Sequence, residues 1–273
     1  MSQQKISGVK GMNDLLPDQV KVWQHVERTT RALFSRFGYG EVRTPVVEDT
    51  ALFVRSVVEE TDIVGKEMYT FEDKGGRSLS LRPEGTAPAA RAYIEHSVMN
   101  QEPLTRWFYM GPMFRYERMK TGRYRQFHQI GVELLGVESA HGDIEVITLA
   151  YDTLQALGLM EAVTLELNTL GDAESRIAYR EALVAYFTQH KAGLSADSQM
   201  RLERNPLRIL DSKDEGDRLL IAGAPRMEDC MTDAAKAYFA EVRAGLDTLG
   251  IAYKLNEKLV RGLDYYRHTA FEF

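Results

Sequence analysis

FRYERMKTGRYRQFHQIGVELLG, residues 114–136, is the stretch that says most about the fold and about a possible site. The alternation of its side chains predicts two strands, 106–117 and 125–136, joined by a basic loop. Five cations fall within eleven positions of a chain whose net charge is −6: Arg115, Arg118, Lys120, Arg123 and Arg125. The planar fork of arginine suits phosphate oxygens better than the point charge of lysine does. The stretch therefore predicts a hairpin that binds a polyphosphate.

The two faces of the second predicted strand differ in character. One face carries Phe127, Gln129, Gly131 and Glu133, and the other carries His128, Ile130, Val132 and Leu134. The second set reads as the core face, and its histidine as a hydrogen-bonded core residue. An even register would add Arg115 and Glu117 to the first face. We expect Gly131 to leave room there for a ligand and Phe127 to offer a ring for base stacking, although a merely solvated sheet face would show the same pattern.

The remaining chain indicates an α+β fold, an antiparallel sheet with helices, rather than a βαβ series. Pro45, in EVRTPVVED (41–49), cannot donate to a central ladder, so this segment is an edge strand or lies at a subunit boundary. Residues 67–82 read as a hairpin, after which Thr86 is expected to cap a helix. Further helices are expected at 18–36, 143–157, 174–190, 195–203 and 231–249, and a strand pattern resumes at 252–273. Residues 170–240 read as a small helical insertion.

Composition narrows the class of protein. No apolar run approaches the roughly 18 residues that span a bilayer, and the N-terminus lacks the apolar core of a signal peptide, so a cytoplasmic protein without membrane partners is expected. Cys230 is the single cysteine, and the histidines are scattered without the spacing of metal ligands. No protein-held metal is therefore expected.

Two further segments carry candidate site residues. Glu84, in LRPEGT (81–86), precedes a predicted helix and would either pair with the helix dipole or, together with Thr86, hold a small ammonium group. Arg261 precedes a glycine and is followed by Tyr265 and Tyr266, which by itself is a weak signal.

Four motifs in this order resemble the histidyl-tRNA synthetases, a family of class II aminoacyl-tRNA synthetases. They are TPVVE (44–48), RPEGT (82–86), FRYER with GRYRQFHQIGVE (114–133) and LVRGLDYY (259–266), and the resemblance covers nearly all 273 residues. It implies a class II antiparallel sheet flanked by helices, formed by 1–169 and 241–273, with 170–240 as the insertion. It also implies a homodimer with Pro45 at its interface.

The same resemblance implies an activity and a set of site residues. Histidine would react with ATP, accompanied by Mg²⁺, to give histidyl-adenylate, and would then pass to tRNA(His). Arg115 and Arg261 would be the catalytic arginines. Histidine would be bound by Glu84, Thr86, Gln129, Glu133, Tyr265 and Tyr266. ATP would be bound by Arg115, Glu117, Arg123 and Phe127.

Departures from the family pattern leave alternatives open. Met119 stands where the family often has proline, and no counterpart of the family's third motif or of its anticodon-binding domain precedes Phe273. We therefore expect a catalytic-domain fragment with little or no activity alone. The alternatives are the non-catalytic, synthetase-like regulatory subunit of ATP phosphoribosyltransferase and a generic nucleotide-binding module. The complete set of Arg115, Arg123, His128, Gln129, Glu133 and Arg261 favours the enzyme over the regulatory subunit. Gln129, Glu133 and the two tyrosines together favour it over the generic module.

Overall fold

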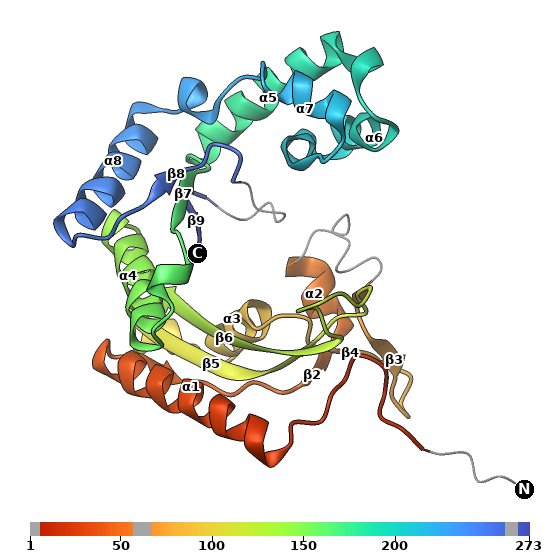
Figure 1. Ribbon diagram of the computed structural model, residues 1–273, viewed down its shortest axis with the longest axis vertical. Helices are drawn as coiled ribbons and strands as arrows, with labels where there is room; N and C mark the ends of the chain where they lie inside the picture. The colour runs from red at the N-terminus through yellow and green to blue at the C-terminus, as the bar shows by residue number, and fades with distance from the viewer. Residues whose placement is uncertain (1–5, 57–66, 260–266) are drawn as a thin grey trace, which may run out of the picture. The chain divides into compact units, whose positions relative to one another are not determined.

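The computed structural model describes residues 6–56, 67–259 and 267–273 of the chain (Figure 1). It divides into two compact units, an N-terminal unit (Met1–Val137 with Gln155–Leu157) and a C-terminal unit (Glu138–Leu154 with Gly158–Phe273). Antiparallel strand pairs flanked by helices are present, so the predicted α+β class is confirmed.

The predicted basic hairpin forms the main sheet of the N-terminal unit. Strand β5 (Thr105–Phe114) pairs antiparallel with β6 (Gln126–Leu135), and β1 (Gly40–Glu41) runs parallel to β5. Gly111 lies opposite Gln129, and the Arg115 amide donates to the Arg125 carbonyl at 2.9 Å. The even register is therefore confirmed, and the odd-numbered side chains of both strands share one face.

Helices cover both faces of this hairpin, as Figure 1 shows for α1 and α3. Helix α1 (Pro17–Arg36) packs on the even-numbered face, where the Phe34 and Phe108 rings lie 5.3 Å apart. Helix α3 (Thr86–Glu95) places Ala89 against Tyr109 and Met113 on the odd-numbered face. A small hydrophobic core thus lies on the same face as the predicted polar site residues.

The prediction that His128 is a hydrogen-bonded core residue was wrong. This histidine is exposed, and its ring lies 4.6 Å from that of Trp23 in α1, so it is not a core histidine. Its neighbour on the same face, Ile130, is 40% exposed. Alternation identifies residues that share a face, but it does not show how far a helix covers that face.

A second sheet has the order β2-β4-β3, formed by Val47–Asp49, Ser78–Leu81 and Thr70–Glu72. The 67–82 hairpin is confirmed, and β2 is an edge strand as Pro45 predicted. The short helix α2 (Thr50–Ser56) follows β2.

Arg82 joins these segments, although the sequence did not single it out. Its side chain is buried, and its guanidinium donates to the carbonyls of Pro112 at 3.0 Å and Thr44 at 2.9 Å. Gly111 gives it space, because a Cβ there would lie 2.6 Å from Arg82 Nη2. The arginine of RPEGT therefore fixes the turn against both the TPVVE segment and the main hairpin.

The C-terminal unit contains a sheet of order β8-β7-β9, formed by Lys254–Leu255, Glu166–Thr169 and Thr269–Glu272. Helices α4 (Ala140–Ala156) and α8 (Asp233–Thr248) contribute Ile147 and Val242 to a core that also contains Leu167 of β7. A second core joins α5 (Ala173–Gln189), α6 (Ala196–Arg204) and α7 (Glu215–Ile221). Short 3₁₀ turns occupy Met160–Ala162, Lys191–Gly193, Pro206–Asp211 and Met227–Cys230 in this unit and Val98–Asn100 in the N-terminal unit.

Helices within the predicted insertion are held partly by a buried carboxylate. Asp217 has no exposed surface and accepts hydrogen bonds from the hydroxyls of Ser195, Ser198 and Ser212 at 2.7, 2.6 and 2.5 Å. These bonds satisfy a charge that would otherwise be costly to bury. The division of the chain into a core and an insertion at 170–240 stays a prediction.

Within the described ranges, no helix combines the length and the apolar character needed to cross a bilayer.

Candidate active site

The RPEGT turn places a carboxylate at the start of helix α3. Glu84 accepts hydrogen bonds from the backbone amides of Thr86 and Ala87, the latter at 3.0 Å. Thr86 is the first helical residue and Gly85 is the N-cap, so the prediction that Thr86 caps the helix was wrong. Glu84 performs that role instead, because its carboxylate reaches the free amides of the first turn. Burial raises the pKa of Glu84, against the opposing effect of these hydrogen bonds.

Glu133 of β6 lies beside this turn. Tyr109 donates its hydroxyl hydrogen to Glu133 Oε1 at 3.3 Å. Burial raises the pKa of Glu133 to about 7, although a hydrogen bond with the Thr86 side chain acts in the opposite direction. The negative charge of Glu84 also raises the pKa of Glu133. The structure thus brings Glu84, Thr86 and Glu133 into one partly buried acidic cluster, which we call the carboxylate cluster and which also includes Tyr109.

The space beside Gly131 is filled by protein. A Cβ on Gly131 would lie 2.3 Å from Tyr109 Cζ, and a Cβ on Gly85 would lie 2.1 Å from Tyr109 Cε2. The prediction that Gly131 leaves room for a ligand was therefore wrong, because the ring of Tyr109 occupies that room. The sequence could have predicted this packing, because the even register places Tyr109 directly opposite Gly131.

Gln129 lies on the same face as Gly131 and Glu133, opposite Gly111 of β5. Its side chain is partly exposed, and the absence of a side chain at Gly111 leaves this part of the face to Gln129 and Arg82. The carboxylate cluster and Gln129 therefore share one surface of the hairpin.

Arginine side chains gather where the two strands of the hairpin end. Arg115 donates from Nε to the Pro83 carbonyl at 2.9 Å, and its Cζ lies 5.1 Å from the centre of the Phe127 ring. Glu117 accepts a hydrogen bond from Arg123 at 2.6 Å and lies 3.9 Å from Arg115 Nη1. The four residues predicted to bind ATP are thus close together in the structure. They offer two guanidinium groups, one carboxylate and an aromatic ring.

The remaining cations of this stretch lie in other surroundings. Arg125 places its Cζ 3.8 Å from the centre of the Tyr116 ring, and its backbone amide donates to the Gly11 carbonyl at 2.8 Å. Arg118 and Lys120 are exposed in the loop. The charge-rich stretch therefore divides into two arginines that share Glu117, one arginine stacked on tyrosine, and two solvated cations.

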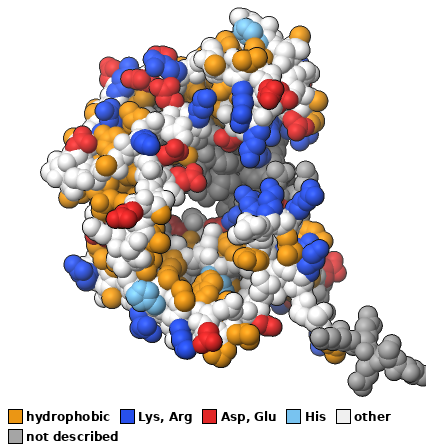
Figure 2. Space-filling model, viewed as in Figure 1, with side chains coloured by type: hydrophobic (Ala, Val, Ile, Leu, Met, Phe, Trp, Pro, Cys, Tyr) orange, Lys and Arg blue, Asp and Glu red, His pale blue; other side chains and the backbone are white. Residues whose placement is uncertain are grey.

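Three predicted site residues, Arg261, Tyr265 and Tyr266, lie outside the described residues. In the described part of the chain, no group of three or more histidine, cysteine, aspartate or glutamate side chains could hold a metal ion. On the face shown in Figure 2, acidic and basic side chains are interspersed, so no single sign of charge dominates it.

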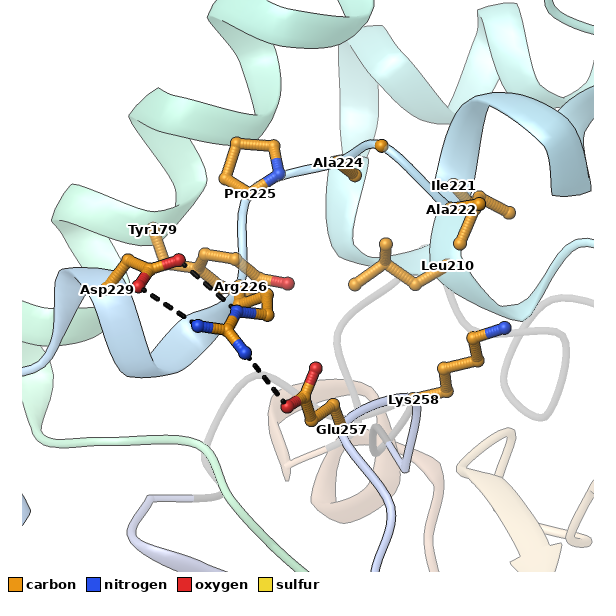
Figure 3. A pocket seen from close by; sticks show the side chains of 11 residues that line it. Tyr179, Leu210, Ile221, Ala222, Ala224, Pro225, Arg226, Asp229, Glu257 and Lys258 are labelled. Atoms are coloured by element: carbon orange, nitrogen blue, oxygen red, sulfur yellow. Dashed lines mark hydrogen bonds and ion pairs between the residues drawn. The ribbon is translucent and has the colours of Figure 1, made fainter.

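A separate cavity of about 460 Å³ lies in the C-terminal unit (Figure 3). Its charged lining is largely paired, because Arg226 lies 3.5 Å from Asp229 Oδ2 and 3.6 Å from Glu257 Oε1. Among the described residues that the sequence predicted to bind histidine or ATP, none lines this cavity. The carboxylate cluster and the neighbouring arginines remain the stronger candidate site.

Comparison with known proteins points to one family. A family model described as histidyl-tRNA synthetase matches residues 11–273. A histidine–tRNA ligase from Rhodospirillum rubrum is 54% identical over 265 residues, which are 97% of this chain and 64% of that protein. One from Thermosynechococcus vestitus is 55% identical over 264 residues, 97% of this chain and 61% of that protein. The chain therefore spans less than two thirds of the length of these curated relatives.

Solved structures show the same relationship. Apo histidyl-tRNA synthetase from S. aureus matches with a TM-score of 0.79 at 41% identity. The match covers 98% of this chain and 61% of the S. aureus chain. A Bacillus halodurans protein, described as an ATP phosphoribosyltransferase regulatory subunit/histidyl-tRNA synthetase, has a TM-score of 0.67 at 23% identity, with 99% of this chain and 73% of that chain covered. The second likeness shows a shared fold only, so it does not favour the regulatory alternative.

Proposed function

Because this chain belongs to the histidyl-tRNA synthetase family, we propose that it carries the site at which histidine reacts with ATP to form histidyl-adenylate. In the whole protein, the histidyl group would then pass to tRNA(His). The observation that carries the proposal is the position of the carboxylate cluster on the same face of one hairpin as Arg115. This arrangement suits a small cationic amino acid next to a polyphosphate.

Histidine recognition is assigned to the carboxylate cluster. Glu133 would accept a hydrogen bond from the imidazole, and its raised pKa of about 7 lies near the usual pKa of histidine, so one proton can be shared between the two groups. Glu84, Thr86 and Gln129 are proposed to hold the α-amino end. Tyr265 and Tyr266 are proposed to complete the pocket.

Adenylate formation requires alignment and neutralisation of charge rather than a general base. The histidine carboxylate is already ionised at neutral pH, so its oxygen can attack the α-phosphorus directly while the bond to pyrophosphate breaks. Arg115 and Arg261 are proposed to stabilise the charge that develops on the phosphoryl oxygens. Phe127 is proposed to lie under the adenine ring, with Glu117 and Arg123 also at the nucleotide.

Magnesium is proposed to enter the site bound to the outer phosphates of ATP, where it would neutralise their charge. The described residues fit this arrangement, because their contribution at the nucleotide is mainly cationic, with Arg115 and Arg123 beside the single carboxylate of Glu117. The work of this chain's own residues is then to bind and orient the nucleotide.

Histidine binding tests the proposal most directly. We expect calorimetry to detect histidine binding to this chain and no comparable binding of phenylalanine, which has a similar size but no imidazole. A chain extended to the length of its relatives is expected to exchange pyrophosphate into ATP only when histidine is present. Failure of the extended chain to show this dependence on histidine would contradict the proposed function.

A homodimer is also proposed, within a cytoplasmic protein. Strand β2 lies at a sheet edge and begins two residues after Pro45. Val46, which precedes the strand, and Val47, its first residue, are 37% and 36% exposed. Exposed apolar side chains at an edge strand suit an interface between copies of the chain. We expect light scattering at micromolar concentration to give twice the mass of one chain, and Val47→Lys to shift the population toward monomer. A monomeric wild-type protein would contradict this proposal.

A further inference from the structure

Tyr109 occupies the centre of the carboxylate cluster. Its ring lies over two glycines from different segments, because a Cβ at Gly85 or at Gly131 would overlap the ring at 2.1 or 2.3 Å. Tyr109 is only 9% exposed and packs with Ala89 and Met113. The side chain therefore fills the interval between the RPEGT turn and strand β6.

The hydroxyl of Tyr109 adds a polar function to this packing. It donates to Glu133 Oε1 at 3.3 Å, and its bond to that carboxylate opposes the effect of burial on the pKa of Glu133. A side chain needed only for packing could end in an apolar ring. Here the ring ends at the carboxylate proposed to bind the imidazole.

We propose that Tyr109 is a positioning residue for histidine recognition: its ring sets the separation of Gly85 and Gly131, and its hydroxyl holds the Glu133 carboxylate in the orientation that accepts the imidazole hydrogen bond. This role rests on the proposed function of the cluster. It requires no direct contact between Tyr109 and the substrate. The ring and the hydroxyl have separable effects, because Tyr109→Phe keeps the first and removes the second.

The test uses Tyr109→Phe in the 273-residue chain. We expect its dissociation constant for histidine to rise about tenfold, as loss of one hydrogen bond to a charged group implies. We also expect the pKa of Glu133 in the ligand-free chain to rise, because the bond that opposed burial is gone. The second effect is followed by the ¹³C shift of the Glu133 carboxyl carbon across about pH 4 to 9. The pH profile of histidine affinity should move to higher pH with it.

Tyr238→Phe is the matched control, because the Tyr238 hydroxyl donates to Asp143 Oδ2 at 3.1 Å in the C-terminal unit. It removes the same kind of bond elsewhere and should change neither the histidine affinity nor the Glu133 titration.

If wild type binds histidine and Tyr109→Phe matches it in affinity and in the Glu133 titration, the role of Tyr109 is overturned while the proposed function stands. If wild type binds no histidine although the Glu133 titration responds to Tyr109→Phe, the proposed function fails, and the role in recognition fails with it.

Discussion

Replacing Arg115 with lysine is expected to slow histidine-dependent exchange of pyrophosphate into ATP by about 10² to 10³-fold. Arg115 uses Nε to bind the Pro83 carbonyl at 2.9 Å, and its Nη1 lies 3.9 Å from Glu117, which is beyond hydrogen-bond distance, so the terminal nitrogens can still meet a phosphate. Lysine cannot make both interactions, because it has one nitrogen and no planar fork. The measurement is the exchange rate at saturating ATP and histidine in a chain extended to the length of its relatives.

Arg28→Lys provides the control for this substitution. Arg28 is exposed on α1, so the change tests whether any loss of guanidinium chemistry slows the reaction. Histidine affinity should change much less than the exchange rate in Arg115→Lys, because the proposed role of Arg115 is at the phosphate. Equal losses in affinity and in rate would assign Arg115 to binding, and an unchanged rate would remove it from the site.

The hairpin at the centre of this site could be predicted because its signals are local. Strict alternation on either side of a glycine-containing loop defines the strands and their register, and a one-residue slip would move every side chain to the opposite face. Pro45 similarly predicts an edge strand from its missing amide hydrogen alone. The helices at 18–36, 174–190 and 195–203 also emerge with bounds within one residue of the structure. Asp172 and Ser195 cap the second and the third of them by accepting hydrogen bonds from the amides of Ser175 and Ser198.

The errors arose where a distant segment decides the local environment. Gly131 appeared to open space for a ligand, but the ring of Tyr109 from the partner strand fills it. Thr86 had the chemistry of a cap, but Glu84, two residues earlier, accepts hydrogen bonds from the first amides of the helix, those of Thr86 and Ala87. The buried Arg82 had no local signal, since its partners at Thr44 and Pro112 lie far along the chain. Short elements such as β7 and α7 were missed because four to seven residues carry too little periodicity.

Glu133→Gln is expected to weaken histidine binding by about 10- to 150-fold, which corresponds to roughly 1.5 to 3 kcal/mol for a lost charged hydrogen-bond partner. The same substitution is expected to stabilise the ligand-free protein above neutral pH. The pKa of Glu133 is about 7 in the folded chain and about 4.5 as the reference for an unfolded one. The folded state therefore binds this proton more tightly than the unfolded state does. The contribution of this proton to the stability of the folded chain is most favourable below about pH 4.5 and is lost as pH rises through about 7.

The full change in the pKa of Glu133 would correspond to roughly 3 kcal/mol in the free energy of unfolding. Because Glu133 keeps some exposure to solvent, we expect a change of about 1 to 2 kcal/mol. Urea unfolding at about pH 5 and pH 8 measures this difference, and Glu181→Gln, on the exposed side of α5, controls for the loss of one carboxylate. Glutamine cannot ionise, so the decline in the free energy of unfolding should be smaller in Glu133→Gln than in wild type. A substitution that lowers histidine affinity while raising stability at pH 8 is the pattern of a carboxylate kept for binding at a cost to the fold. An equal decline in both proteins, together with unchanged histidine affinity, would show that Glu133 is neither strained by burial nor part of the pocket.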